Sequence, residues 1–339
     1  MIRLTMFSSA EKVKGQGVAS AYRELINLLF NQTELYDMKI NTYRSTDISH
    51  YHTVDLPFYV STFSKKRGVK VGYVHFIPET VDDSLQLPKW FRRFFYAYLI
   101  SFYKRMDKLV VVNPAFISKL EAYGIAKNRI EYIPNFVSNQ TFYPMDPVKR
   151  NQLKEQHVPS KAFTVLGAGQ IQQRKGVLDF IEVAKKLPDV QFIWVGGFSF
   201  GKITSGYKEL KLIVDNPPKN VLFTGIVDRE QMNMYFNLAD VMFLPSFHEL
   251  FPMTILEGMS CERPILLRDL ELYEDILFDY YLKASSIEGF VKEITQLQND
   301  SNYYEAARLS AAKGAYHYSE ERLTEIWQDF YHGLEGITR

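Results

Sequence analysis

The stretch DVMFLPSFHELFPMTILEGMSCERP, residues 240–264, indicates a buried strand that runs through a loop into a helix. We predict the strand over 240–245, because a short apolar run closed by Pro and Ser is typical of a parallel sheet. Apolar residues at helical spacing follow from Met253, and a proline ends the helix. Glu249 therefore lies at the carboxyl end of a strand, where α/β proteins usually bind ligands, and Glu257 lies within the helix.

Two carboxylates placed in this way fit an elongated ligand that is rich in hydroxyl groups. A carboxylate only accepts hydrogen bonds, so Glu249 and Glu257 are each suited to a pair of vicinal hydroxyls. The free N–H groups at the helix start would face a phosphate between them. A sugar nucleotide has this layout. The structural alternative is that Glu249 caps the helix and Glu257 is a solvated helix residue.

The composition indicates a well-packed protein with two domains of ordinary size. The chain has 339 residues, of which 46 % are hydrophobic and 23 % are charged. Its single cysteine, Cys261, excludes an internal disulfide and suits a reducing cytoplasm. We expect no signal peptide at the N-terminus and no membrane-spanning helix, because the apolar run at 94–100 is too short to cross a bilayer.

Charge is distributed unevenly along the chain. Residues 1–150 contain 21 Lys and Arg against 13 Asp and Glu, a net charge of +8, whereas the remainder contains 19 against 26, a net charge of −7. A basic part of this kind suggests a surface that meets something anionic, such as nucleic acid or an anionic bilayer. The sequence has no nucleic-acid-binding motif.

Strands and helices alternate along the chain, which is typical of an α/β protein with parallel sheets. A proline-rich stretch, 134–147, reads as a linker between two such domains. We predict strands over 2–7, 38–43, 69–76, 162–169 and 264–267, and helices over 17–30, 87–108, 113–124, from Gly176 onward and within 286–336.

Several motifs, in the order found here, resemble those of the retaining glycosyltransferases of family 4, also called group 1, which have the GT-B fold. Glu249 and Glu257 match the E-x7-E signature, after a strand that ends in Pro-Ser. The other matching segments are Gly15-Gln16-Gly17, His75 in VGYVHFIPE, 129–144, 167–187, 192–197 and 221–240. The chain is similar in particular to Gram-positive bacterial enzymes that add a sugar to diacylglycerol or monoglycosyl-diacylglycerol.

The resemblance implies two Rossmann-like, doubly wound domains that face each other across a cleft. We expect an N-terminal domain on the acceptor and membrane side over 1–155, joined by the C-terminal helix at about 320–339. The C-terminal domain, 156–319, would bind the nucleotide sugar.

The resemblance also implies roles for four catalytic residues. The family histidine that matches His75 lies under the donor sugar and helps to hold the acceptor side of the site. The basic pair that matches Arg174 and Lys175 neutralises the leaving diphosphate, and Glu249 binds the sugar hydroxyls. A hydrogen-bonded structural histidine and a solvated basic loop are the alternatives.

The donor site implied by the family also includes the start of the helix that carries Glu257, whose carboxylate binds the ribose hydroxyls. Two departures from the family pattern occur: Gln170 replaces the usual arginine, and Pro252 lacks the N–H group that a glycine would offer. Thr254 is expected to compensate for that missing donor. The expected donor-binding residues are Gly15, Gly17, Arg174, Lys175, Phe251, Met253, Thr254, Glu249 and Glu257.

Residues 87–108 combine aromatic residues at helical spacing with basic residues and the single acid Asp107. Aromatics rimmed by bases are typical of a helix lying in a membrane interface. The alternative is a helix packed on its own sheet. The expected membrane and acceptor contacts are Lys89, Trp90, Phe91, Arg92, Arg93, Phe94 and Phe95, with Lys65, Lys66, Arg67 and Lys70 as an extension of the patch.

The activity implied is transfer of glucose or galactose, with retention, from a UDP-sugar to diacylglycerol or monoglycosyl-diacylglycerol in glycolipid and lipoteichoic-acid anchor synthesis. A capsule or wall-polymer glycosyltransferase with a polyprenyl-linked acceptor and a non-catalytic GT-B scaffold are alternatives. We expect no required metal or other cofactor, since the sequence has only Asp82-Asp83 and no D-x-D, and we interpret His50 and His52 as loop residues. The expected partners are the nucleotide sugar, the lipid acceptor and an anionic membrane, with a cytoplasmic, peripheral location on the inner face of the cell membrane.

Overall fold

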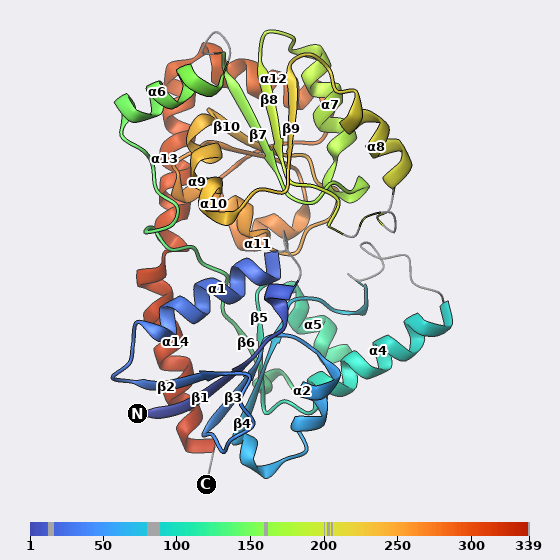
Figure 1. Cartoon of the computed structure of the whole chain (residues 1–339), viewed down its shortest axis with the longest axis vertical. Coiled ribbons are helices and arrows are strands. Elements are labelled where there is room, and N and C mark those ends of the chain that lie inside the picture. The colour runs from blue at the N-terminus through green and yellow to red at the C-terminus, as the bar shows by residue number, and fades with distance from the viewer. Residues whose placement is uncertain are drawn as a thin grey trace. The chain divides into compact units, whose positions relative to one another are not determined.

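The computed structural model describes residues 1–12, 17–79, 89–158, 162–199, 201, 204 and 206–337. The chain forms two compact units, each built on a six-stranded parallel sheet with helices on both faces (Figure 1). Unit 1 consists mainly of Val18–Phe136 with the first strand and the C-terminal helix, and unit 2 of Val137–Ser319. This confirms the expected α/β class with two Rossmann-like domains.

The sheet of unit 1 has the strand order β2-β1-β3-β4-β5-β6. Its strands are β1 (Ile2–Phe7), β2 (Tyr36–Ile40), β3 (Ile48–Tyr51), β4 (Val69–Val74), β5 (Lys108–Val111) and β6 (Ile130–Tyr132). The helices are α1 (Gly17–Phe30), α2 (Leu56–Ser61), α4 (Lys89–Lys104), α5 (Ala115–Ala122) and α14 (Glu320–Leu334). The C-terminal α14 therefore belongs to the unit that contains β1.

The sheet of unit 2 has the strand order β12-β11-β10-β7-β8-β9. Its strands are β7 (Thr164–Ala168), β8 (Gln191–Val195), β9 (Val221–Gly225), β10 (Val241–Leu244), β11 (Ile265–Arg268) and β12 (Leu282–Ala284). The helices are α6 (Pro147–His157), α7 (Val177–Lys186), α8 (Tyr207–Asp215), α9 (Arg229–Leu238), α10 (Met253–Ser260), α11 (Glu274–Leu277), α12 (Ile287–Asn299) and α13 (Ser301–His317).

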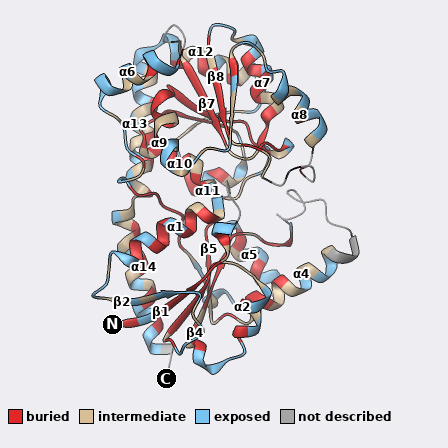
Figure 2. Ribbon diagram, viewed as in Figure 1, coloured by how far each residue is buried: buried red, intermediate tan, exposed pale blue. Residues whose placement is uncertain are grey.

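The core of each unit lies between its sheet and the covering helices. Figure 2 shows the central strands as buried and the outward faces of the helices as exposed. In unit 2 the ring of Phe180 on α7 packs edge-on against Trp194 of β8, at 5.1 Å between centroids, and stacks on Phe243 of β10 at 5.7 Å. All four residues of β10 are buried, which explains why this strand is an uninterrupted apolar run.

The segment between β6 and α6 is held by unit 2, so that unit begins at Val137 and not near 156. The backbone N–H of Tyr143 donates to the Asn233 side chain at 3.1 Å, and that of Met145 donates to Asn237 at 2.7 Å. Both asparagines lie on α9. A proline-rich, aperiodic segment is thus fixed by side-chain amides rather than by secondary structure.

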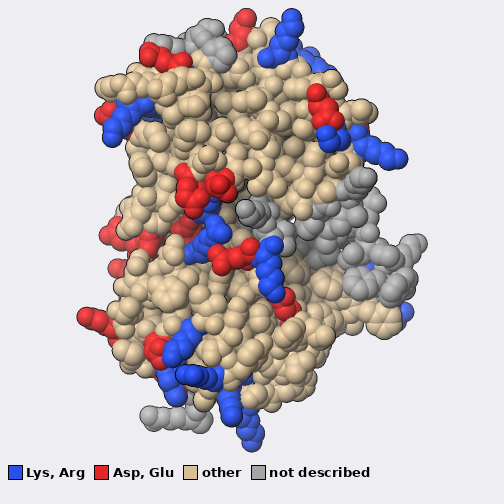
Figure 3. Space-filling model, in the orientation of Figure 1, with Lys and Arg blue, Asp and Glu red and all other residues tan. Residues whose placement is uncertain are grey.

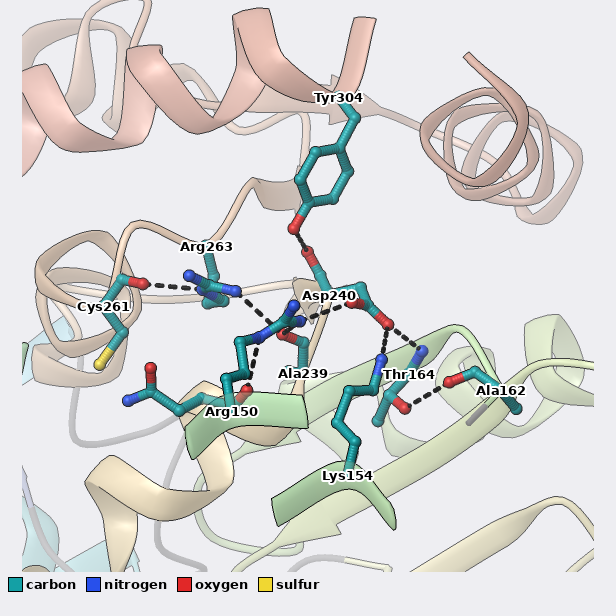
Figure 4. A network of polar contacts seen from close by, with 10 residues as sticks. Arg150, Lys154, Ala162, Thr164, Ala239, Asp240, Cys261, Arg263 and Tyr304 are labelled. Carbon is teal, nitrogen blue, oxygen red and sulfur yellow. Dashed lines mark hydrogen bonds and ion pairs between the residues drawn. The ribbon is translucent and has the colours of Figure 1, made fainter. Parts of the chain in front are cut away.

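A buried charge network positions the start of β10 (Figure 4). The Asp240 carboxylate accepts from Arg150 at 2.6 Å and from Lys154 at 2.5 Å, both on α6, and from the backbone N–H of Thr164 at 2.8 Å. Tyr304 of α13 donates to the Asp240 carbonyl at 3.1 Å. The Asp240 side chain therefore links α6 and β7 to the start of β10, the strand that leads into the E-x7-E segment.

The surface shows no single basic face in the view of Figure 3, where acidic and basic side chains are interspersed on both units. Among the helices that the structure describes, none is both long enough and apolar enough to span a bilayer.

Candidate active site

The E-x7-E segment lies at the point in unit 2 where the strand order reverses. From β7 the chain continues to β8 and β9 on one side of the sheet, and then to β10, β11 and β12 on the other side. Open α/β sheets bind ligands at the carboxyl ends of the two strands that flank this point. The short 3-10 turn Gln173–Lys175 follows β7, and the loop with Glu249 follows β10.

Lys175 and Glu249 form a buried ion pair at these two strand ends. The Lys175 Nζ lies 2.5 Å from Glu249 Oε1, and the two side chains are 9 % and 4 % exposed. Arg174 places Nη1 3.7 Å from Glu249 Oε2 and donates from the same atom to the His248 carbonyl at 3.1 Å. Residues 74 positions apart in sequence are joined because β7 and β10 are neighbours in the sheet.

Electrostatics keep this carboxylate ionised. Burial alone would raise the pKa of Glu249, but the charges of Lys175 and Arg174, with the hydrogen bond from Lys175, lower it below its ordinary value. The site therefore contains two cations, Lys175 and Arg174, and one hydrogen-bond acceptor, the Glu249 carboxylate. That combination can bind hydroxyl groups and an anionic group side by side.

Gly176 makes the close approach of the two loops possible. Its φ of +68° lies in the left-handed region, and a Cβ built on it would lie 2.1 Å from the Pro245 carbonyl oxygen at the end of β10. Any side chain here would therefore push the loop after β7 away from β10. This would separate Lys175 from Glu249.

The helix α10 begins at Met253 directly after Pro252, which makes no side-chain cap. Phe251 and Met253 are buried, at 5 % and 3 % exposed. The Thr254 hydroxyl is buried and has no hydrogen-bond partner among the described residues. An uncapped helix start with an unpaired hydroxyl leaves donors for an anionic ligand, as the sequence suggested for this segment.

Glu257 is buried on α10 and paired. Its Oε1 accepts from Arg229 Nη1 at 2.7 Å, and the two side chains are 4 % and 13 % exposed. The Arg229 guanidinium lies over the ring of Phe142, 4.9 Å from its centroid. The alternative of a solvated helix residue is therefore wrong for Glu257, and its carboxylate has a fixed orientation.

Comparisons with known proteins show the family to which the chain belongs. Residues 148–314 match the model of "Glycosyl transferases group 1", and residues 18–140 match that of "Glycosyltransferase Family 4". The alpha-galactosylglucosyldiacylglycerol synthase of Streptococcus pneumoniae is 47 % identical over all of this chain and 91 % of its own. The chain belongs to the group 1 glycosyltransferases of family 4. The processive diacylglycerol alpha-glucosyltransferase of Acholeplasma laidlawii is 32 % identical over 61 % of this chain and 62 % of its own.

Solved structures support the GT-B fold of this glycosyltransferase. Anabaena HepE in complex with UDP and glucose aligns over 98 % of this chain and 100 % of its own, with a TM-score of 0.78 and 14 % identity. The sucrose-phosphate synthase of Thermosynechococcus elongatus aligns over 99 % and 100 %, with a TM-score of 0.81 and 13 % identity. At these identities the likeness concerns the fold.

His75 of this glycosyltransferase belongs to unit 1, at the end of β4, in a buried stack of rings. Its Nε2 lies 2.8 Å from the Nε2 of His52, so one of the two donates to the other, and its ring stacks on Tyr73 at 4.5 Å. His50 on β3 shares its Nδ1 with the Tyr331 hydroxyl of α14 at 2.6 Å. The interpretation as a loop residue is wrong for His50, which lies within β3. His52 follows the end of that strand, as expected of a loop residue, but it is buried.

Burial makes these histidines acid-sensitive. It lowers the pKa of His50 and of His75 to about 3, so both are neutral in the folded chain near pH 7. The unfolded chain binds protons at the ordinary value of 6.5, so stability is full above pH 6.5 and is lost as the pH falls toward 3. We expect a loss of about 2 kcal/mol per histidine at pH 5.

Urea unfolding of the wild type and of His75→Gln at pH 7.5 and pH 5 measures this effect. The variant should lose less stability between the two pH values than the wild type does. Equal losses would show that His75 takes up no proton on unfolding and would contradict the buried, neutral state.

The structure describes only one of the two glycines that were predicted to bind the donor. Gly15 lies outside the described residues. Gly17 is the first residue of α1, and a Cβ built on it would meet no described atom within 4 Å. Packing within the described part of the chain therefore does not require glycine at position 17.

The aromatic helix α4 packs partly on its own sheet. Leu99 and Phe102 are fully buried, whereas Phe94 is 71 % exposed, and Arg93 is also exposed. The C-terminal half of the helix therefore faces the core, as in the alternative of a helix packed on its own sheet, whereas Phe94 and Arg93 in the N-terminal half are exposed. Arg92 and Phe95 are partly buried, and the side chains of Lys89, Trp90 and Phe91 lie outside the described residues.

Two of the bases expected to extend the patch are held inside unit 1. Arg67 is 1 % exposed and donates to the carbonyls of residues 42, 43 and 44. Lys70 is paired with Asp107 at 2.9 Å. Lys65 and Lys66 are exposed, so they remain available at the surface.

Sequence reasoning missed two residues that surround the carboxylates. Arg229 follows Asp228 at the start of α9, and the packing of α9 beside α10 brings it to Glu257. Tyr273 is fully buried, and its hydroxyl has no hydrogen-bond partner within the part of the chain that the structure describes. Burial, with a contribution from the Glu249 charge, raises the pKa of Tyr273 well above the ordinary value. Among the described residues no group of three or more His, Cys, Asp or Glu is arranged to hold a metal ion.

Proposed function

We propose that this glycosyltransferase moves glucose or galactose from a UDP-sugar to diacylglycerol or monoglycosyl-diacylglycerol, with retention of the anomeric configuration. The buried Lys175–Glu249 pair at the carboxyl ends of β7 and β10, with Glu257 on the next helix, carries this proposal. The name of the Streptococcus pneumoniae relative supports a diacylglycerol-based acceptor. HepE, solved with UDP and glucose, supports a UDP-linked donor.

The site residues would act by positioning and charge. Glu249 accepts hydrogen bonds from the sugar hydroxyls, and Glu257 accepts them from the ribose. Lys175 and Arg174 stabilise the negative charge that grows on the diphosphate as its bond to the sugar breaks. The acceptor hydroxyl attacks the same face of the sugar and gives its proton to the departing phosphate oxygen. Most of the rate enhancement therefore comes from holding the donor and the acceptor in this orientation. We propose that these two cations make a divalent metal unnecessary.

Thin-layer chromatography of labelled products tests the proposed activity. The purified protein is incubated with radiolabelled UDP-glucose or UDP-galactose and with vesicles that contain diacylglycerol or monoglucosyl-diacylglycerol, with and without EDTA. A labelled lipid formed by one donor and one acceptor, and insensitive to EDTA, is expected. Binding of UDP without any labelled lipid would overturn the acceptor class and favour a polymer acceptor or a non-catalytic scaffold.

Glu257→Gln is expected to weaken UDP binding by roughly ten- to a hundredfold. The change removes a charged hydrogen-bond acceptor, which contributes about 1.5–3 kcal/mol, while it keeps the shape of the side chain. Isothermal titration with UDP measures the Kd. Glu262→Gln is the matched control, because that carboxylate is paired with Arg308 away from the ribose position. An unchanged Kd in Glu257→Gln would contradict the ribose role.

We further propose that unit 1 contacts an anionic membrane on the inner face of the cell membrane. Phe94 and Arg93 are exposed on α4, next to a C-terminal half that is anchored in the core by Leu99 and Phe102. An exposed aromatic on a fixed helix beside basic residues is suited to a lipid headgroup region. The lipid acceptor proposed above lies in the bilayer, so the enzyme needs a membrane contact of this kind to reach it.

Phe94→Ser is expected to lower partitioning onto phosphatidylglycerol vesicles by roughly tenfold, since an apolar side chain buried in lipid contributes about 1.5–3 kcal/mol when fully buried. Vesicle flotation measures the partition coefficient. Tyr316→Ser, at a 73 % exposed aromatic in unit 2, is the control and should leave partitioning unchanged. Equal partitioning of Phe94→Ser and the wild type would exclude α4 from the membrane contact.

A further inference from the structure

A groove of about 660 Å³ lies in unit 1 beside α4, apart from the residues assigned above to the donor site. One wall is formed by Tyr59 of α2 and by Phe63 just after it, and the other by Ile100 and Ser101 of α4. The Tyr59 hydroxyl and the Ser101 hydroxyl are 2.7 Å apart and join the two walls. We call this feature the α2–α4 groove.

The helix α2, which contributes Tyr59 to the α2–α4 groove, also carries an exposed apolar stripe that ends at the groove residue Phe63. Leu56, Val60 and Phe63 are 64 %, 61 % and 61 % exposed, and their spacing of four and three residues places them on one side of α2 and its end. The opposite side is held in the unit by Phe58, which is buried. A surface helix normally turns its polar side outward, so three neighbouring apolar residues in water indicate contact with something apolar.

The groove is also a site of unneutralised positive charge. Arg105 is fixed by its donation to the Thr62 hydroxyl at 2.5 Å and the Thr62 carbonyl at 3.0 Å, and its guanidinium lies 3.5 Å from the ring centroid of Phe63. Lys104 lines the groove and is exposed, and its ammonium group has no hydrogen bond or ion pair among the described residues. Lys70 also lines the groove, but Asp107 neutralises it.

Acidic residues are missing from the chain segments that form the groove. Residues 56–67 and 89–105 contain no Asp or Glu. The combination of a fixed guanidinium, a free ammonium and an apolar stripe matches an amphiphile with a phosphate group. A free phosphate would use the cations but would leave the stripe on α2 in water.

We propose that the α2–α4 groove binds the headgroup phosphate of one anionic phospholipid molecule of the bilayer. Lys104 and Arg105 contact the phosphate, and Leu56, Val60 and Phe63 lie among the acyl chains. This inference rests on the membrane contact proposed above and deepens it, because it assigns a defined lipid site to α2 in addition to the exposed aromatic of α4. Arg105 is suited to this task because its planar guanidinium is already held in place.

Titration with a soluble short-chain lipid tests the groove separately from the membrane. Dihexanoyl-phosphatidylglycerol below its critical micelle concentration is titrated into the full chain, and binding is followed by isothermal calorimetry. Saturable binding is expected, with at least a tenfold weaker affinity in Lys104→Ala. Lys119→Ala, which removes one exposed charge from α5, is the matched control and should bind as the wild type does. Dihexanoyl-phosphatidylcholine and inorganic phosphate should bind at least tenfold more weakly.

The remaining outcomes test the lipid site in the groove separately from the proposed membrane contact. Absence of lipid binding, or an affinity that is unchanged in both Lys104→Ala and Arg105→Gln, would overturn the lipid site in the groove. Flotation of the wild type with phosphatidylglycerol vesicles would in that case still support the membrane contact. Inorganic phosphate that binds as tightly as the short-chain lipid overturns the lipid assignment. Lys104-dependent lipid binding without vesicle flotation supports the groove and overturns the membrane contact.

Discussion

Lys175→Met is expected to lower kcat by roughly a hundred- to a thousandfold with a smaller change in KM. The ammonium group lies at the carboxyl end of β7, 2.5 Å from Glu249, and we assign it to the charge that develops on the departing diphosphate. Removing one preorganised group of this kind typically costs about 2.7–4 kcal/mol of transition-state stabilisation. Steady-state kinetics with the donor and acceptor pair found by chromatography measures the effect.

A loss of activity in this variant also has a structural explanation, because the change leaves the buried Glu249 without its nearest cation. The double variant Lys175→Met/Glu249→Gln separates the two causes. It removes the uncompensated charge, so its thermal midpoint should return toward that of the wild type, while its kcat should stay low. Lys208→Met changes an exposed lysine of the same unit and should keep full activity. Recovery of kcat in the double variant would contradict a direct role of Lys175.

The strand, loop and helix of the E-x7-E segment were predictable because each has a local signal. The run at 241–244 is entirely apolar, and Pro245 closes it. The helix spacing from Met253 agrees with α10, which ends at Ser260 before the proline. Local chemistry decides such elements, because each residue's partners lie within a few positions.

The partners of the two glutamates have no local signal. Lys175 is 74 positions from Glu249, and Arg229 is 28 positions from Glu257. Only the order β10-β7 in the sheet and the packing of α9 beside α10 bring these pairs together. The family resemblance named Lys175, but neither pattern nor resemblance led to Arg229.

The strand β3 and the helix α2 were missed for a related reason. The sequence ISHY of β3 contains two polar residues and lacks an uninterrupted apolar run, yet all four residues are buried between β1 and β4. His50 is tolerated there because the Tyr331 hydroxyl and neighbouring rings surround it. The segment Leu56–Ser61 turns apolar residues outward, so its sequence lacks the inward apolar stripe that indicates a surface helix.

Asp240→Asn is expected to lower the free energy of unfolding by about 3–5 kcal/mol at pH 7, the usual cost of removing one partner from a buried ion pair. The change leaves Arg150 and Lys154 facing a neutral amide, and the Asp240 side chain is only 12 % exposed. Asn can still accept a hydrogen bond from the Thr164 N–H, so the expected loss of stability comes from the two ion pairs.

Urea unfolding at fixed pH and salt measures the difference, with Asp215→Asn as the control. That carboxylate forms a solvent-exposed pair with Lys211, which should contribute little to stability, so this variant should unfold almost as the wild type does. If Asp240→Asn and Asp215→Asn were equally stable, the network would not hold the start of β10. The Lys175–Glu249 geometry at the other end of that strand would then need a different support.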